Sequence, residues 1–258
     1  MQQNTSARAA AAAAMLAAGL ALAGCGSSAS SSAGGSATHS AAASAAASTS
    51  AATSTGTSDS VPFPVAAGNT WTYDITAATE SGTTVNKMTA VTPVAGGQQV
   101  TMTSANHLAG VTTNNSETYI FHSDGSITYP LSGFSASGVT VTGSSGILWP
   151  SASVIDAGTP TTSTLKLTIK AAGESLATTA LVTVQGEGTA SVTVPAGTYQ
   201  ATVVLVTERI SIEGVTATIE IKTWLAPGIG PVKDQVTTAD GGTSAIAAEE
   251  QLVSFTKG

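Results

Sequence analysis

The sequence has few charged residues and a single cysteine. Asp, Glu, Lys and Arg make up 9% of its 258 residues, whereas about a quarter is usual in soluble domains. The formal net charge is −7, so the chain offers no basic surface to nucleic acid or to an anionic membrane. Because Cys25 has no second cysteine to pair with, an intramolecular disulfide and a cysteine-rich metal cage are excluded. Stability must come from burial and strand pairing.

The sequence also lacks recognisable catalytic and metal-binding motifs. The segment nearest to a Gly-x-Ser-x-Gly elbow, 133–137, is not followed by a helical pattern. His107 and His122 are interpreted as satisfied surface or core residues rather than as catalytic bases. Asp124 and Asp240 stand in short Asp-Gly turns, which supply too few oxygen ligands for calcium. We therefore expect no metal, no cofactor and no enzymatic activity.

The first 24 residues predict a secretion signal. A short polar start with Arg8 is followed by an apolar Ala/Leu run of roughly fifteen residues, shorter than the ~20 that span a bilayer. The run ends at Leu22-Ala23-Gly24-Cys25, which resembles a bacterial lipobox. The resemblance implies cleavage before Cys25 and acylation of Cys25 with fatty acids such as palmitate, which would anchor the protein stably in a membrane. The alternative is an ordinary signal peptide with an incidental cysteine.

Residues 25–60 predict a flexible tether. They are almost entirely Ser, Ala, Thr and Gly, a composition that cannot bury enough apolar surface to offset the entropy of ordering. A flexible chain of this length spans on the order of 30–35 Å. We therefore expect an exported protein, lipid-anchored to the cell membrane or outer membrane through Cys25. Its folded domain would face the periplasm, the wall or the exterior.

Residues 61–258 predict one antiparallel β domain. Short runs of alternating hydrophobicity recur between turn signals, which is typical of a sandwich, a half-barrel or another strongly curved sheet. No segment has a convincing helical stripe, and 244–251 is the one short candidate. Besides the region described next, the expected strands cover 67–73, 83–94, 98–105, 116–122, 126–131, 161–171, 177–184, 232–237 and 251–256.

The clearest β signal is a long hairpin within Ser191–Lys233. Apolar residues alternate from Val192 to Leu205 with an interruption at 195–197, and alternation resumes after a turn at Glu213-Gly214. Before this region, 186–188 is expected to form a turn. Glu208 and Glu220 are placed to face each other across the hairpin, although Arg209, Lys222 and water are the expected partners of these carboxylates.

Three motifs resemble a widespread group of poorly characterised bacterial secreted proteins and lipoproteins. They are Phe63-Pro64-Val65-x-x-Gly68-Asn69-x-Trp71-x-Tyr73, Val194-Pro195-Ala196-Gly197-Thr198-Tyr199, and Trp224-x-Ala226-Pro227-Gly228-x-Gly230. The resemblance spans nearly all of 61–258 and implies a curved antiparallel sheet similar to the lipoprotein-carrier fold. It implies no reaction. Leu225 stands where an aromatic residue is common in the group.

Two functional hypotheses follow. The favoured one is a non-enzymatic interaction module that binds an envelope protein or a wall polymer. The alternative is a carrier or sensor of lipid or another apolar ligand, with space left inside the sheet by Ala180, Ala201 and Ala217. The candidate ligand-binding residues are Trp71, Trp224 and Tyr199, although large aromatic residues more often serve as packing residues.

Overall fold

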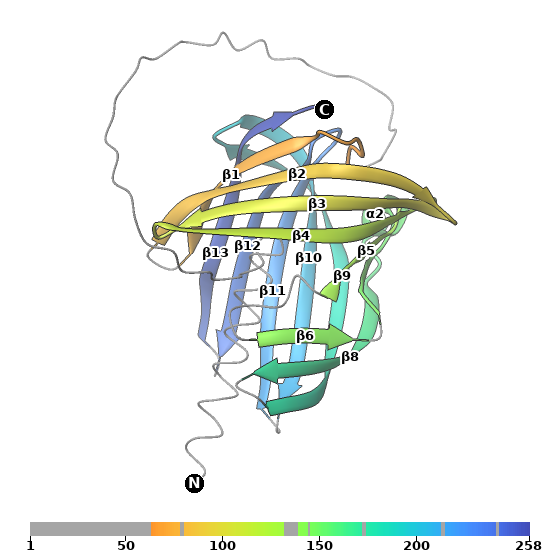
Figure 1. The fold of residues 1–258 in the computed structure, drawn as a ribbon, viewed down its shortest axis with the longest axis vertical. Helices are drawn as coiled ribbons and strands as arrows, with labels where there is room; N and C mark the ends of the chain where they lie inside the picture. The colour runs from red at the N-terminus through yellow and green to blue at the C-terminus, as the bar shows by residue number, and fades with distance from the viewer. Residues whose placement is uncertain are drawn as a thin grey trace.

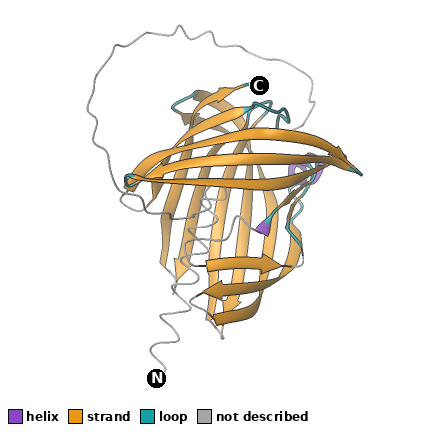
Figure 2. Cartoon of the chain, viewed as in Figure 1, coloured by secondary structure: helices purple, strands orange, loops and turns teal. Residues whose placement is uncertain are grey.

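The computed structural model describes residues 63–77, 80–131, 139–143, 145–171, 174–212, 215–240 and 243–258. In these residues thirteen strands form one antiparallel sheet with the spatial order β6-β8-β9-β10-β11-β12-β13-β1-β2-β3-β4-β5-β7 (Figures 1 and 2). The predicted curved all-β fold is confirmed. The strands are β1 (Thr70–Ala77), β2 (Glu80–Val94), β3 (Gly97–Leu108), β4 (Val111–His122), β5 (Ile127–Tyr129), β6 (Val139–Gly143), β7 (Ile147–Trp149), β8 (Thr161–Ala171), β9 (Glu174–Val194), β10 (Gly197–Ile212), β11 (Val215–Ala226), β12 (Gly230–Asp240) and β13 (Thr243–Thr256).

The sheet curves so that its two halves face each other. In Figure 1 strands β1 to β4 run across the direction of β9 to β13 and lie in front of them. The halves are joined where β1 pairs with β13, from Thr70 opposite Thr256 to Ala77 opposite Ala248. Residues of the first and last thirds of the described chain therefore share one interior. The predicted signal sequence, with Cys25 and the tether that follows it, lies outside the described residues.

Hairpins predicted from the sequence are present. Ile212 of β10 pairs with Val215 of β11, and Phe121 of β4 pairs with Ile127 of β5 after the Asp-Gly turn. Alternation of side chains across the strands explains the buried set on β1, where Trp71, Tyr73 and Ile75 are all at most 3% exposed.

Two turn predictions were wrong. The interruption at 195–197 is a tight hairpin in its own right, because Gly197 of β10 pairs directly with Val194 of β9. Gly197 has φ +137°, a conformation that a residue with a Cβ rarely adopts. By contrast, the expected turn at 186–188 lies within β9, which runs continuously from Glu174 to Val194. Opposite it, the register with β10 shifts between Thr202 and Val204.

The buried positions of β10 change from odd to even numbers at this point in the strand. Before it, Ala201 and Val203 are buried; after it, the buried positions are Val204, Val206 and Glu208. The extra residue belongs to β9, since Val203 alone of β10 lies opposite two residues of β9, and β10 pairs with β11 without a shift. Glu208 therefore lies on the same buried side of β10 as Val204 and Val206.

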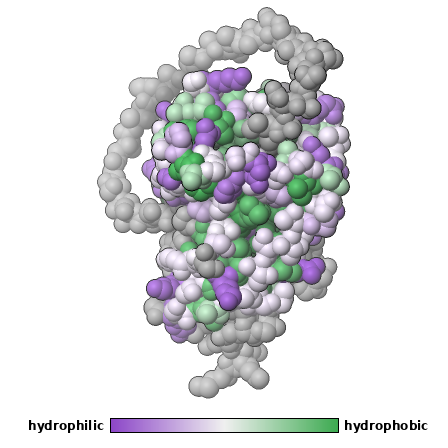
Figure 3. All heavy atoms as spheres, turned by 90° about the vertical axis from the view of Figure 1, so that its right-hand side faces the viewer, coloured by the Kyte–Doolittle hydropathy of each residue, from purple (hydrophilic) through white to green (hydrophobic). Residues whose placement is uncertain are grey.

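The helical candidate at 244–251 is also wrong, since it lies in β13. In the described chain a short helix, α2 (Ala152–Asp156), instead packs against β9. A Cβ added at Gly186 would lie 1.9 Å from the carbonyl oxygen of Ile155, so this contact depends on glycine. Apolar side chains also reach the surface, as in the middle of the face shown in Figure 3.

Candidate functional site: a cavity with aromatic and acidic walls

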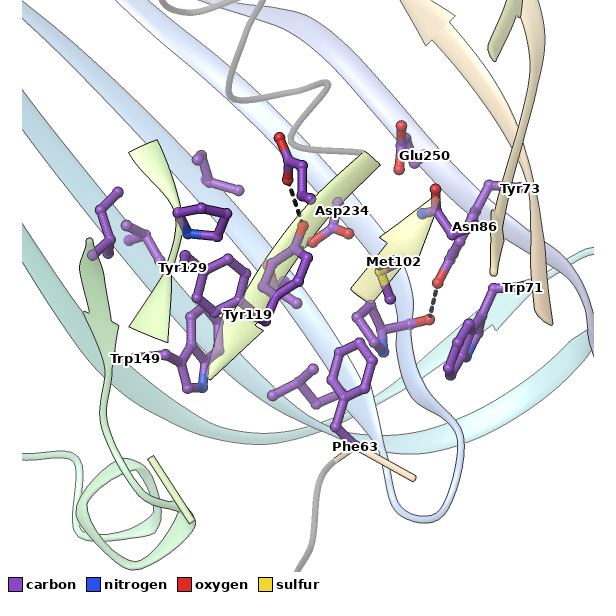
Figure 4. Close-up of a pocket in the computed structure, with 18 of the residues that line it drawn as sticks. Phe63, Trp71, Tyr73, Asn86, Met102, Tyr119, Tyr129, Trp149, Asp234 and Glu250 are labelled. Carbon is purple, nitrogen blue, oxygen red and sulfur yellow. Dashed lines mark hydrogen bonds between the residues drawn. The ribbon is translucent and has the colours of Figure 1, made fainter. Parts of the chain in front are cut away.

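A cavity of about 170 Å³ lies between the two halves of the sheet. Figure 4 shows aromatic side chains around it together with Asp234, Glu250 and Asn86. Its walls come from β1 to β5, β7 and β10 to β13, together with Phe63 and Pro130, which lie outside the strands. The wall residues are Phe63, Trp71, Tyr73, Asn86, Met102, Glu117, Tyr119, Phe121, Tyr129, Pro130, Ile147, Trp149, Val206, Glu208, Ile221, Thr223, Leu225, Pro231, Asp234 and Glu250.

One side of the cavity is formed by a series of contacting aromatic rings from β4, β5 and β7. The ring centroids of Tyr119 and Tyr129 are 5.2 Å apart in an edge-to-face arrangement, and those of Tyr129 and Trp149 are 5.9 Å apart. Phe63 forms a second contact, with its ring 5.6 Å from that of Trp71. These separations are typical of favourable aromatic pairs.

Trp71 and Tyr73 are held by the backbone that links β11 to β12. The indole Nε1 of Trp71 donates to the carbonyl oxygen of Ile229 at 2.7 Å. The hydroxyl of Tyr73 donates to the carbonyl oxygen of Pro231 at 3.0 Å, as Figure 4 shows. Both donors are therefore engaged, and the two rings present apolar surface to the cavity.

Four carboxyl groups line the same space. Asp234 of β12 and Glu250 of β13 are register partners, and Thr223 of β11 is the partner of Asp234 on its other side. Glu208 comes from β10 and is 2% exposed, while Glu250 is 7% exposed. One Oε atom of each of these two glutamates is buried without a hydrogen-bond partner, as is the Oδ1 atom of Asn86.

Burial shifts the protonation of these groups. Desolvation raises the pKa of Glu208 to about 8. It also raises the pKa of Glu250 to about 8, with a further contribution from the nearby charge of Asp234. For Asp234 desolvation raises the pKa to about 6, against the effect of a hydrogen bond from Thr223. A low-dielectric surrounding disfavours the charged carboxylate, which accounts for all three shifts.

Glu117 differs because its carboxylate is partnered. It accepts the hydroxyl of Tyr119 at 2.7 Å and the side-chain amide of Asn115 at 3.0 Å. Its pKa is nevertheless raised by burial, although these hydrogen bonds oppose the shift. Glu117 therefore orients the Tyr119 ring at the cavity wall.

The structure separates the three candidate ligand-binding residues. Trp71 lines the cavity. Tyr199 and Trp224 do not: the Tyr199 hydroxyl donates to the carbonyl oxygen of Ala196 at 3.2 Å, and the Trp224 ring lies beneath the Nζ atoms of Lys222 and Lys233.

The small residues and histidines also lie elsewhere. Ala180 and Ala201 are buried outside this cavity, and Ala217 is half-buried and is not among its wall residues. His107 contacts the hydroxyl of Thr112, and His122 that of Thr128.

Sequence reasoning missed the acidic wall. Glu208 was expected to meet Arg209, Lys222 or water, and that expectation was wrong. The signal that could have located it is the even-numbered run Val204, Val206, Glu208, Ile210 and Ile212, which places the carboxyl on an apolar face. Asp234 and Glu250 have no comparable signal, because their proximity depends on the pairing of β12 with β13.

Comparison with known proteins assigns a family. The DUF3108-like family model matches residues 66–241. The chain belongs to the DUF3108-like family. No curated protein matches the sequence.

Two solved structures share the fold of this DUF3108-like chain. A "putative exported protein with YmcC-like fold" from Bacteroides fragilis is 18% identical, with a TM-score of 0.52. A "putative lipoprotein" from Parabacteroides distasonis is 15% identical, with a TM-score of 0.56. Each match covers 76% of this chain and 98% of the other. At this identity the likeness concerns the fold.

The described residues contain neither a membrane-spanning helix nor a cluster of metal ligands. No helix in this part of the chain is long and apolar enough to cross a membrane. Within the same residues, no three His, Cys, Asp or Glu side chains are grouped so that they could hold a metal ion.

Proposed function

We propose that this protein is an exported, lipid-anchored binding protein that holds a small organic ligand in the interior cavity and does not transform it. The supporting observation is that apolar aromatic walls enclose unpartnered buried oxygens of Glu208 and Glu250. A few polar groups in a mostly apolar concave site are the usual composition of a ligand pocket.

The buried carboxyl groups of Glu208 and Glu250 lower the stability of the fold. Leaving a buried polar group unpaired costs about 1–3 kcal/mol. Apolar residues at positions 208 and 250 would avoid this cost and would pack against neighbours such as Val206 and Ile210. A bound molecule that supplies hydrogen-bond donors would offset this loss of stability. On this argument Glu208 and Glu250 serve ligand binding rather than the stability of the fold.

The size of the cavity limits its occupant. An engineered protein cavity of about 150 Å³ accommodates benzene, and the present cavity has about 170 Å³. A ring-sized molecule, or the end of a longer one, fits this volume, whereas a complete acyl chain does not. The cavity therefore favours the ligand-binding hypothesis over the interaction module that the sequence favoured. Its volume also indicates a ligand smaller than a complete lipid.

The absence of turnover is part of the proposal. His107 and His122 are not among the cavity-lining residues, and each is bonded to a threonine hydroxyl. The cavity thus offers carboxyl groups and aromatic rings without the paired nucleophile and base that acyl transfer requires.

Export and anchoring rest on the lipobox-like segment and on the descriptions of the two structural neighbours. Cells that produce the chain would be fed alkyne-tagged palmitate. We expect the wild-type protein to be labelled and the Cys25→Ala variant to be unlabelled. A labelled Cys25→Ala protein would contradict acylation at this residue.

The binding role is tested by the molecules that accompany the protein. The full chain and an Ile221→Trp variant would be purified identically, denatured and extracted, and the extracts compared by mass spectrometry. Ile221 lines the cavity, so the added indole fills it, while lipids that associate with the outside remain in both extracts. Met102→Trp is a second cavity-filling variant in case the first does not fold.

We expect a small molecule that is present with the wild type and absent with the folded variant. Identical extracts from the two proteins would contradict a cavity ligand. Such a result would favour the interaction-module hypothesis instead.

A further inference from the structure

We infer that the ligand is an organic ammonium ion whose positively charged nitrogen lies beside the register pair Asp234 and Glu250 and whose apolar body lies against the aromatic wall. This inference rests on the proposed binding function and specifies the chemistry of the ligand.

The charges of the cavity are of one sign. Among the described residues that line it, four are acidic and none is Lys, Arg or His. The nearby lysines, Lys222 and Lys233, instead lie over the ring of Trp224, which is not a cavity residue. Lys233 is engaged there with Glu249 at 2.8 Å, and Lys222 with Glu187 at 2.6 Å. The described residues around the cavity thus provide no counter-charge for the acidic wall.

The unsatisfied atoms are oxygens that can accept hydrogen bonds. Each of Glu208 and Glu250 has a buried Oε atom without a partner, and Asn86 contributes a buried Oδ1. Asp234 is already bonded to the Thr223 hydroxyl through one oxygen. An ammonium group supplies several N–H donors together with the missing positive charge, and hydrogen bonds between charged groups are the stronger kind.

The aromatic wall suits the rest of such a ligand. Tyr119, Tyr129 and Trp149 form a continuous series of ring contacts on one side of the cavity. In the view of Figure 4 the carboxyl group of Asp234 lies between Tyr119 and the pair Asn86 and Tyr73. Aromatic faces attract cations and also pack against apolar carbon.

Other ligand classes fit less well. An anion would meet four carboxyl groups and no cation. A metal ion is disfavoured because the acidic residues of the described chain are not grouped closely enough to coordinate one. A neutral alcohol could donate one hydrogen bond but would leave the carboxylate of Asp234, whose pKa of about 6 keeps it ionised at pH 7, uncompensated in an apolar surrounding.

Binding of a cation should be linked to proton release. The titratable groups that face the cavity are Tyr73, Glu117, Tyr119, Tyr129, Glu208, Asp234 and Glu250. With pKa values of about 8, Glu208 and Glu250 are largely protonated at pH 7 in the empty cavity. A bound ammonium group favours their charged forms, so protons leave and affinity rises between pH 6 and pH 8.

The test uses two probes of matched shape. Benzylamine, which is positively charged at neutral pH, and benzyl alcohol, which is neutral, would be titrated calorimetrically into the full chain held in lipid nanodiscs. Protein-free nanodiscs give the blank. We expect benzylamine to bind at least about tenfold more tightly than benzyl alcohol, because only the amine can form charge-assisted hydrogen bonds with the acidic wall.

Substitutions test whether the preference for benzylamine depends on the acidic wall of the cavity. The double variant Asp234→Asn/Glu250→Gln should lose the preference for the amine, with Glu250→Gln alone as a second variant should the double one not fold. Glu220→Gln is the matched control, because Glu220 is an exposed glutamate on the neighbouring strand β11. It should retain the wild-type preference, and thermal unfolding would verify that each protein is folded.

The outcomes separate the two proposals. A preference for the amine that the cavity variants abolish supports the inference. Equal affinities, tighter binding of the alcohol, or a preference that survives in the double variant would overturn it while leaving the cavity-binding role intact. Failure of folded protein to bind either probe also overturns it, and the extraction experiment then decides the binding role independently.

Discussion

Asp234 and Glu250 are register partners on β12 and β13, and both side chains line the same cavity. Desolvation is the main reason that the pKa of Glu250 is raised to about 8, and the charge of Asp234 adds to it. Two carboxyl groups placed side by side without a cation destabilise each other's ionised form. The acidic wall is therefore a cost to the empty domain.

This cost predicts an unusual dependence of stability on pH. Glu208 and Glu250 hold their protons in the native state up to about pH 8, whereas unfolded glutamates ionise near 4.5. Between these values the native state binds more protons than the unfolded state, so the free energy of unfolding falls as pH rises. We expect a decrease on the order of 1 kcal/mol per pH unit for each group, measured by urea denaturation from pH 5 to pH 8.

Substitution of Glu208 isolates one part of this effect. Glu208→Gln should flatten the pH dependence and stabilise the protein at pH 8, where the native carboxyl group would otherwise be forced to ionise. Glu220→Gln should leave the slope unchanged. Equal slopes in the wild type and Glu208→Gln would show that Glu208 is not desolvated.

The coupling between Asp234 and Glu250 predicts a shift that carboxyl NMR titration can measure. Asp234→Asn should lower the pKa of Glu250, yet leave it above the ordinary glutamate value, because desolvation is the larger cause. Thr223→Val removes a hydrogen bond to Asp234 and should raise the pKa of Asp234 above about 6. An unchanged Glu250 titration in Asp234→Asn would disprove the coupling.

The indole side chains of Trp71 and Trp224 should differ in their contribution to stability. Trp71 is 1% exposed and donates to the Ile229 carbonyl, so Trp71→Phe should lower the free energy of unfolding by about 1–3 kcal/mol. Trp224 is half-buried beneath two lysines, and Trp224→Phe should cost less than about 1 kcal/mol. Chemical denaturation that gives equal losses would contradict these assignments.

Packing of α2 on β9 predicts intolerance at Gly186. In Gly186→Ala the new methyl group would collide with the Ile155 carbonyl oxygen, and we expect a loss of about 1–3 kcal/mol in chemical denaturation. Gly188→Asn is the control. Its φ of +88° is one that asparagine tolerates better than most residues, and no atom lies within 4 Å of an added Cβ. A larger loss at position 188 than at 186 would refute the packing argument.

The local sequence determined most of the strands and several of their hairpins, but not β6 and β7. Period-two alternation and an Asp-Gly or Glu-Gly turn need only neighbouring residues, which is why the pairing of β10 with β11 and of β4 with β5 could be predicted. The same reasoning identified Trp71 as a candidate ligand contact. It misassigned 195–197 and 186–188 because a turn and a bulge use the same residue types, Gly and Pro among them.

Only the tertiary structure decided where the acidic groups lie. Glu208 was expected to meet solvent, but it lies on the same side of β10 as Val204 and Val206, which the curved sheet encloses. Pairing of β1 with β13 brings together strands distant in the chain, so that Glu117 and Tyr119 face the same cavity as Asp234 and Glu250. Alternation specifies the two faces of each strand, but which face becomes the interior is decided by how the whole sheet pairs and curves.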